Sequence, residues 1–552
     1  MISPPVPQPF FTPDAPPETA ERPRATATEA PAEHVAVLVC HGMGQQVRFG
    51  TLDDLARAVF ATAVRCKTAL DPDISVALQP DAGNFHARAE LNLKKSDGSR
   101  ASVHFYEAYW APLTEGRVTL RETLRFFVDA GLGGLRFAWR DGVFNRSMFG
   151  GRQEFEIPAR RIWQLGLALW VLLLVSTAFA AVTVLPLFIT ADRLRAAGAD
   201  REIAGAATVA LSIGVVILVS FLIAMIAARA AGVGADTGRP KSATDAQPGM
   251  MASKSWRRWG SAALTVIAAI ASIVITAVAG YLMYRCWLLP AAEDPVKNWP
   301  RAVLAVILLG GEAFAFLRVM RGFLIEFGGD VAAYVAPFKV SKFEEIRRAI
   351  QERGRSAARF IYAVRAPGSD RPLYDRVMVV GHSLGSVLAY DTLNDAMNRD
   401  ASPEGWGAGS RAHQYDVVNR TRLLLTFGSP LDKTAFIFRT QRNALEVTAR
   451  EKLASAVQPL IQNYDNRRCR WVNVWSRSDW ISGPLGYYDQ PQPPPGQGVC
   501  NIENRGSRNP GTAHTEYWEG PLISGVLHHA LIGTCPPDVP EPQRSRIVAA
   551  LA

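Results

Sequence analysis

Short apolar runs bounded by turn residues occur in two separate parts of the chain, one before residue 110 and one after residue 370. Runs of this length are typical of buried strands. Strands are therefore predicted at 35–39, 73–79, 87–93, 101–108, 376–380, 421–427 and 470–475. Amphipathic helices are predicted over 52–65 and 342–353, and further helical segments separate the later strands. Strands alternating with helices predict an α/β fold.

The middle of the chain has a different pattern. Residues 162–189, 203–228 and 259–284 contain no charged residue, and a helix that spans the hydrocarbon core of a bilayer needs about 20 apolar residues. Three transmembrane helices are therefore predicted. A fourth, shorter apolar run over 302–317 contains Glu312 and is followed by Arg318 and Arg321, and a central charge disfavours insertion by roughly 2.5–3.5 kcal/mol. Hydropathy alone leaves this fourth segment undecided.

These patterns divide the chain into five parts. Residues 1–33 are rich in proline and are expected to form a disordered tail. The two α/β parts cover 34–160 and 326–535, and they flank a transmembrane block at 161–325. Residues 536–552 are expected to form a C-terminal tail.

Composition supports a chain that is partly in lipid. Of its 552 residues, 48% are apolar and only 20% are charged, and the mean hydropathy is +0.04. A disordered or collagen-like chain is excluded. In a membrane protein, the net charge of +10 indicates basic cytoplasmic loops and contact with anionic headgroups rather than binding to nucleic acid. Six scattered cysteines without a C-x-x-C pair indicate neither a zinc site nor a disulfide framework.

The most informative motif is a G-x-S-x-G pattern centred on Ser383. Gly381 and Gly385 flank it, the run 377–380 precedes it, and a helix-compatible run follows it. This context is typical of a nucleophile elbow, in which the serine occupies a sharp turn between a strand and a helix. The N-terminus of that helix would face a developing oxyanion.

A second motif, His41-Gly42-Met43-Gly44, follows the first predicted strand. Ester hydrolysis uses two backbone N–H donors at the carbonyl oxygen, one from the residue after the nucleophile and one from a loop after an earlier strand. Leu384 and Met43 are the predicted donors. The side chain of His41 is expected to be structural.

Together, these two motifs resemble those of lipase- and esterase-type serine hydrolases of the α/β-hydrolase superfamily. The resemblance covers roughly 34–110 and 360–535. It implies a triad in the chain order Ser, Asp or Glu, His. Ser383 is then the nucleophile.

The order restricts the choice of catalytic histidine. Five of the nine histidines precede Ser383, namely His34, His41, His86, His104 and His382, and His413 precedes the acid candidates. The remaining candidates are His514, His528 and His529. His514 lies in a loop-like segment and is favoured, whereas His528 and His529 lie in a segment that reads as a helix.

The acid is expected to follow a late strand. Asp479 lies just after the strand predicted at 470–475, where its carboxylate could orient the histidine. Asp432, after the preceding strand, is the alternative. Ser429 also follows a strand but lacks the second glycine of an elbow, and it is expected to be structural.

Membrane topology follows from this chemistry. The oxyanion strand and the elbow must share one sheet, because their atoms converge within about 3 Å of one carbonyl oxygen. The number of crossings between them is then even, so 302–325 is predicted as a fourth span. Lys and Arg near the spans place the catalytic domain on the cytoplasmic face.

The sequence thus predicts an α/β-hydrolase sheet interrupted by four transmembrane helices. The expected protein is a membrane-anchored serine hydrolase that cleaves carboxylic esters, with lipid-type esters at the bilayer as the favoured substrates. The alternative is a membrane scaffold or transport-related protein with an inactive or regulatory hydrolase-like domain. No metal, cofactor or nucleic-acid partner is expected, because the sequence has no metalloprotease, P-loop or dinucleotide-binding motif. The oligomeric state is left open.

Overall fold

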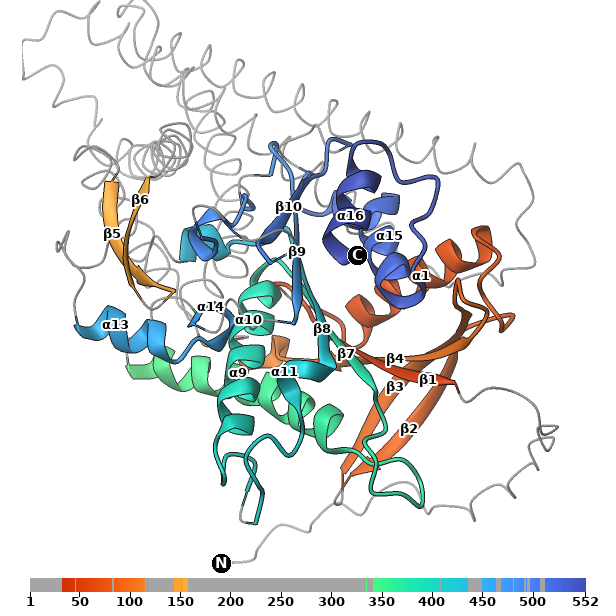
Figure 1. Ribbon diagram of the computed structural model, residues 1–552, viewed down its shortest axis with the longest axis horizontal. Helices are drawn as coiled ribbons and strands as arrows, with labels where there is room; N and C mark the ends of the chain where they lie inside the picture. The colour runs from red at the N-terminus through yellow and green to blue at the C-terminus, as the bar shows by residue number, and fades with distance from the viewer. Residues whose placement is uncertain are drawn as a thin grey trace, which may run out of the picture.

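Eight strands, four from each α/β part of the chain, form a single sheet (Figure 1). The computed structural model describes residues 32–44, 46–81, 84–114, 117, 143–149, 151–156, 334, 341–407, 409–434, 449–462, 468–479, 481–490, 493, 497–506 and 512–552. The strands are β1 (Glu33–Cys40), β2 (Ser75–Asp81), β3 (Asn84–Lys94), β4 (Arg100–Ala108), β7 (Arg376–His382), β8 (Thr421–Phe427), β9 (Arg470–Trp475) and β10 (Val499–Glu503). Each of the seven predicted strands coincides with one of these, and β10 was not predicted.

The strand order is β10-β9-β8-β7-β1-β4-β3-β2. The neighbouring pairs from β10 to β4 are parallel, whereas β3 and β2 run antiparallel at one edge. At the centre, β1 pairs with β7 from Val35↔Arg376 to Cys40↔Gly381. The prediction that the strand before His41 and the strand before Ser383 share one sheet is therefore confirmed, although more than 300 residues separate the two strands in sequence.

Helices cover both faces of the sheet (Figure 1). In β1, Ala36, Leu38 and Cys40 share a hydrophobic cluster with α9 (Ser341–Ala363) and α10 (Leu384–Ala401). Val35, Val37 and Val39 belong to the opposite cluster, with α1 (Gly50–Arg65) and α15 (Pro521–Ile532). Because successive strand residues point to opposite faces, a sheet covered on both sides needs the continuous apolar runs seen in this sequence.

Shorter elements complete the described fold. They are η1 (Ala111–Leu113), α11 (Val417–Arg420), α13 (Ala449–Ala456), α14 (Pro459–Gln462), η6 (Gly486–Tyr488), η7 (Glu516–Trp518) and α16 (Gln543–Leu551). A separate antiparallel hairpin of β5 (Val143–Met148) and β6 (Gly151–Glu156) lies beside α13. Residues 536–552, expected to form a tail, instead carry α16, and its Ile547 is buried in the cluster that includes α15.

The transmembrane part of the predicted fold class requires correction. Within the described ranges, no helix combines the length and the apolar character needed to cross a membrane. The longest, α9, has 23 residues but carries charges along its length. The most apolar, α15, has 12 residues, or about 18 Å at 1.5 Å per residue, against about 30 Å of hydrocarbon.

The segments predicted as spans, 162–189, 203–228, 259–284 and 302–325, lie outside the described residues, as does almost all of the predicted tail at 1–33. The absence of a membrane-crossing helix among the described residues contradicts the expected bundle of four transmembrane helices and the expected multi-pass localisation. The fold class is accordingly a mostly parallel α/β sheet between two layers of helices.

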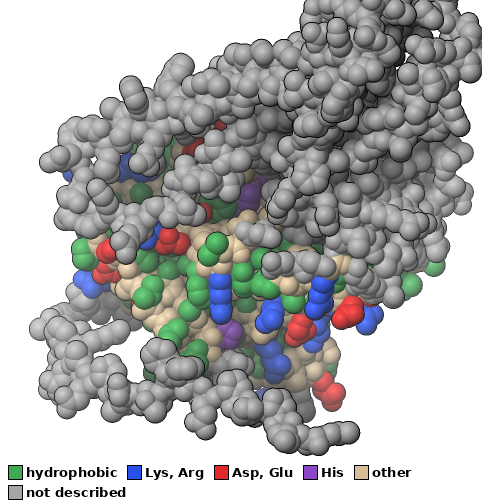
Figure 2. Space-filling view, turned by 180° about the vertical axis from the view of Figure 1, so that it is seen from behind, with side chains coloured by type: hydrophobic (Ala, Val, Ile, Leu, Met, Phe, Trp, Pro, Cys, Tyr) green, Lys and Arg blue, Asp and Glu red, His purple; other side chains and the backbone are tan. Residues whose placement is uncertain are grey.

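Acidic and basic side chains lie interspersed on the described surface seen in Figure 2. Ion pairs within one helix include Arg348 with Glu344 and Arg355 with Glu352 on α9. Exposed pairs of this kind contribute little to stability, typically about 0.3–0.5 kcal/mol each.

Candidate active site

The candidate nucleophile occupies the turn between β7 and α10. Ser383 has φ 53° and ψ −131°, a conformation that L-residues rarely adopt. Its N–H donates to the carbonyl of Phe427 on β8 at 3.0 Å, and β7 is paired on both sides, with β1 and β8. The surrounding sheet therefore holds the strained residue in place, as the predicted elbow requires.

Glycine is required at the flanking positions because backbone atoms lie very close. A Cβ on Gly385 would lie 2.2 Å from the carbonyl oxygens of Cys40 and His41, and one on Gly381 would lie 2.5 Å from the Cα of Ser386. These contacts let the start of α10 pack against the end of β1. The elbow and the loop after β1 therefore form one unit.

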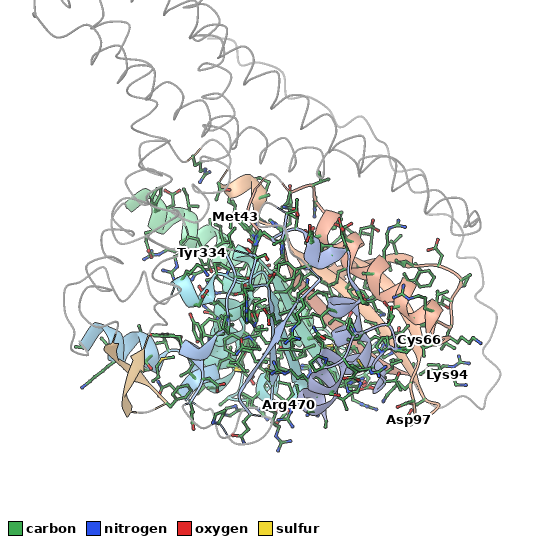
Figure 3. The ribbon with its side chains drawn as sticks, turned by 90° about the horizontal axis from the view of Figure 1, so that it is seen from above. Met43, Cys66, Lys94, Asp97, Tyr334 and Arg470 are labelled. Atoms are coloured by element: carbon green, nitrogen blue, oxygen red, sulfur yellow. The ribbon has the colours of Figure 1, made fainter. Side chains whose placement is uncertain are left out.

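The four-residue loop His41–Gly44 lies directly against the nucleophile. A Cβ on Gly42 would lie 3.0 Å from the Cβ of Ser383, and Gly44 has φ 94°. The loop follows the carboxyl end of β1. In Figure 3, Met43 accordingly lies at the opposite end of the sheet from Asp97 and Arg470, which lie near amino ends of strands.

Three side chains from separate segments form a continuous chain of hydrogen bonds. The Nε2 atom of His514 lies 2.8 Å from the Oγ of Ser383. The Nδ1 atom of His514 lies 3.0 Å from Oδ2 of Asp479. A carboxylate can only accept, so Nδ1 carries the proton and Nε2 accepts the hydrogen bond from the serine hydroxyl. The structure thus brings together the three residues predicted from chain order.

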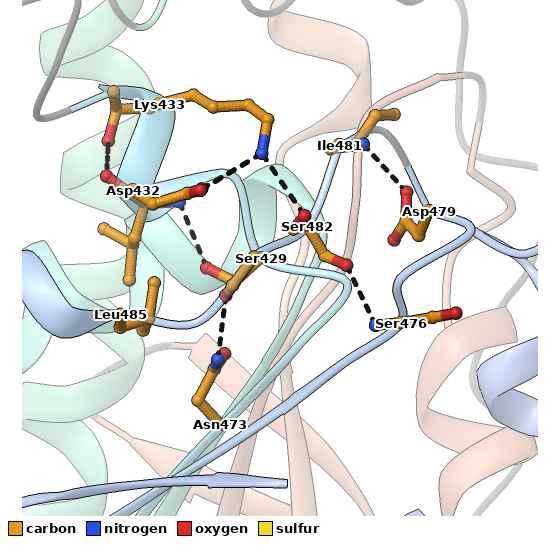
Figure 4. Close-up of polar contacts among 12 residues, drawn as sticks. Ser429, Asp432, Lys433, Asn473, Ser476, Asp479, Ile481, Ser482 and Leu485 are labelled. Carbon is orange, nitrogen blue, oxygen red and sulfur yellow. Dashed lines mark hydrogen bonds and ion pairs between the residues drawn. The ribbon is translucent and has the colours of Figure 1, made fainter. Parts of the chain in front are cut away.

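The Asp479 carboxylate is buried, with 1% of its side chain exposed. The N–H of Ile481 donates to Oδ1 at 2.9 Å (Figure 4), and the Tyr517 hydroxyl donates to Oδ2 at 3.0 Å. Burial alone would raise the pKa of Asp479. The nearby His514 and the hydrogen bond from the Ile481 N–H outweigh burial and hold the pKa well below its usual range. Asp479 is therefore ionised at neutral pH.

A relay of donors orients this carboxylate. The backbone N–H of Ser476 donates to the Ser482 hydroxyl at 3.3 Å, and that hydroxyl pairs with the Tyr517 hydroxyl at 2.8 Å. Since Tyr517 donates to Asp479, Ser482 donates to Tyr517. Sequence reasoning missed Tyr517, and no motif marks it beyond its position three residues after His514.

Asp432, the alternative acid, pairs with Lys433. The Lys433 ammonium lies 3.2 Å from both carboxylate oxygens of Asp432 and also donates to the Ser482 carbonyl (Figure 4). Ser429 is buried, its hydroxyl pairs with the Ser386 hydroxyl on α10, and it accepts a hydrogen bond from the N–H of Leu431. Asp432 and Ser429 therefore make structural contacts that join the loop after β8 to neighbouring segments.

The alternative histidines lie on α15. Both ring nitrogens of His528 are occupied, at 2.9 Å each, by the Thr68 hydroxyl and the Thr534 carbonyl. His529 follows it on the helix, and its Nδ1 is buried. Among the described residues, no hydrogen bond joins either histidine to Ser383.

The two predicted oxyanion donors flank the nucleophile. Leu384 is the first residue of α10, and Met43 lies in the loop against Ser383; both are buried. The orientation of the Gly42–Met43 peptide is fixed by His41. The Trp110 N–H donates to Nε2 of His41 at 2.9 Å, so the protonated Nδ1 donates to the Gly42 carbonyl at 2.8 Å. In a trans peptide the Met43 N–H then points away from the His41 ring.

His41 is structural, as expected. Its ring stacks on Trp110 with centroids 4.9 Å apart, and burial lowers its pKa to about 4. It therefore stays neutral and holds the loop.

Within the described ranges, no group of three or more His, Cys, Asp or Glu side chains is arranged to hold a metal ion. Comparisons of the chain with protein-family models, with curated proteins and with solved structures find no match. Any functional conclusion consequently rests on the motifs and the geometry of this chain alone.

Proposed function

We propose that this protein is a serine ester hydrolase of the α/β-hydrolase type. The observation that carries the proposal is the chain of hydrogen bonds from Asp479 through His514 to Ser383, on a strained turn between a strand and a helix. Nucleophile, base and orienting acid in mutual contact are the arrangement that activates a serine hydroxyl.

In the proposed reaction, Oγ of Ser383 attacks the ester carbonyl carbon while Nε2 of His514 takes the hydroxyl proton. The tetrahedral intermediate collapses as His514 returns this proton to the leaving alcohol oxygen, and an acyl-serine remains. Water then attacks the acyl carbon and gives a proton to His514. That proton returns to Ser383 as the carboxylic acid leaves.

Asp479 stabilises the imidazolium that forms in each step and fixes the tautomer of His514. The N–H groups of Met43 and Leu384 stabilise the oxyanion. One such donor typically contributes about 10²–10³-fold to kcat.

Carboxylic esters are the proposed substrates. The preference for lipid esters was inferred from a membrane location that is now contradicted, so it is not part of the proposal. A panel of p-nitrophenyl esters of increasing acyl length, followed by acylglycerols and phospholipids, would define the acyl preference.

The proposal is tested with a fluorophosphonate probe and p-nitrophenyl butyrate. The wild type is expected to be labelled and to hydrolyse the ester, and Ser383→Ala is expected to lose both. Ser429→Ala is the matched control, because Ser429 is also a buried serine after a sheet strand but lies outside the triad. A folded wild type that is neither labelled nor active would refute the proposal.

A further inference from the structure

The loop that carries His514 is attached to the elbow by a residue the triad does not use. His514 and the nearby Tyr517 both belong to the segment that starts at Thr512, where backbone hydrogen bonds from Thr515 and Glu516 to the Thr512 carbonyl form a tight turn. The His514 side chain is held at both ring nitrogens. Its main chain makes a further contact, with His382.

The Nε2 atom of His382 lies 3.2 Å from the carbonyl oxygen of His514. A carbonyl can only accept, so Nε2 carries a proton and donates. Burial, together with the neighbouring His514, lowers the pKa of His382 to about 3. The His382 ring is therefore neutral at neutral pH, and its single proton stays on Nε2, where this hydrogen bond needs it.

The His382 ring is fixed on several sides. It stacks on Phe427 with centroids 5.0 Å apart and meets the edge of Trp518 at 5.3 Å. A Cβ on Gly428 would lie 3.2 Å from its Nε2, and one on Gly42 would lie 3.2 Å from its Nδ1. The ring cannot move without displacing these neighbours.

Three loops thus meet at one side chain. They are the loop after β1, at Gly42, the loop after β8, at Gly428, and the segment of His514. His382 itself immediately precedes Ser383, so its ring links the backbone of the nucleophile to the backbone of the base.

We propose that His382 is a positioning residue that sets the distance between His514 and Ser383 by holding the His514 carbonyl. This inference rests on the proposed function. Distances near 2.8 Å allow efficient proton transfer, and a misplacement of about 1 Å can cost about 10²-fold in rate. Loss of one neutral hydrogen bond at the edge of the site is expected to lower kcat about tenfold.

The test compares two neutral amides. In His382→Gln the side-chain nitrogen lies about where Nε2 lies and can still donate to the His514 carbonyl. In His382→Asn it lies near the position of Nδ1 and cannot reach. His382→Gln is expected to keep kcat within about threefold of wild type. His382→Asn is expected to lower both kcat and the rate of fluorophosphonate labelling about tenfold, with KM unchanged.

Two results would overturn the inference. The first is wild-type kcat in His382→Asn. The second is equal impairment of His382→Gln and His382→Asn, which would indicate that the His382 side chain acts through packing alone. If His382→Asn does not fold, His382→Met, of similar volume and without a donor, takes its place with the same expectations.

An NMR measurement separates failure of this inference from failure of the proposed function. The proton of the His514 Nδ1–Asp479 hydrogen bond is expected to give a low-field NMR signal in the wild type and in His382→Gln, and a broadened or shifted signal in His382→Asn. This signal can be measured even if the wild type turns over no ester. An unchanged signal in His382→Asn would contradict the positioning role of His382 irrespective of activity.

Discussion

Tyr517 donates its hydroxyl to the carboxylate oxygen of Asp479 that also binds His514, and both distances are 3.0 Å. One buried oxygen therefore has two donors, and its neighbour Oδ1 has the N–H of Ile481. This arrangement keeps the carboxylate charged where solvent cannot reach it.

Replacing Tyr517 with Phe is expected to destabilise the fold by about 1–3 kcal/mol, because it removes a hydrogen bond to a buried charge. Losing this donor should raise the pKa of Asp479, so the stability contributed by the ionised carboxylate should be lost at a higher pH than in the wild type. Urea unfolding at a series of pH values checks both expectations. Tyr390→Phe is the control, since its hydroxyl donates to neutral Gln458 and its loss should leave kcat unchanged. Equal effects of the two variants would contradict the role of Tyr517.

The identity of the acid is tested by Asp479→Asn and Asp432→Asn. An amide at 479 favours the wrong tautomer of His514, and kcat is expected to fall about 10³–10⁴-fold. An amide at 432 removes the pairing with Lys433 and should leave kcat within about threefold. Steady-state kinetics with p-nitrophenyl butyrate decides between them. The opposite ranking would assign the acid to Asp432.

The elbow depends on the absence of a side chain at Gly385. A Cβ there would lie 2.2 Å from two carbonyl oxygens, so Gly385→Ala is expected to destabilise the protein by about 3 kcal/mol and to abolish activity. Gly486→Ala is the control, because its Cβ would meet nothing within 4 Å. Denaturant unfolding measures both. A stable, active Gly385→Ala variant would show that the elbow geometry is wrong.

Buried neutral histidines predict a dependence of stability on pH. Burial is the main cause that lowers the pKa of His41 to about 4 and of His104 and His382 to about 3. The unfolded chain binds these protons at about pH 6.5. Stability is therefore fully present above about pH 6.5, and it falls by up to about 1.4 kcal/mol per pH unit for each histidine as the pH drops toward the folded pKa.

Urea unfolding between pH 7 and pH 4.5 measures this slope. His104→Gln removes a buried histidine that lies outside the candidate site and should reduce the slope. His413→Gln removes an exposed histidine and serves as the control. A slope that is identical in wild type and His104→Gln would contradict the prediction.

Much of the local structure could be read from residue order. The apolar run 35–39 and the elbow run 377–380 predicted strands because sheets covered on both faces bury every residue of their central strands. The chain order implied by the α/β-hydrolase resemblance limited the catalytic histidine to His514, His528 and His529, and the loop-like setting of His514 favoured it. The transmembrane part of the fold class expected from hydropathy is wrong, because no helix among the described residues has the length and apolar character to cross a membrane.

Residue order alone predicts a serine between a strand and a helix and limits the residues that could partner it. The choice between Asp479 and Asp432 required the folded chain, because both follow strands and the difference lies in what surrounds each carboxylate. The contacts of Tyr517 and His382 likewise required the fold. They join segments that are distant in sequence, and such contacts depend on the packing of strands and loops, which no local pattern records.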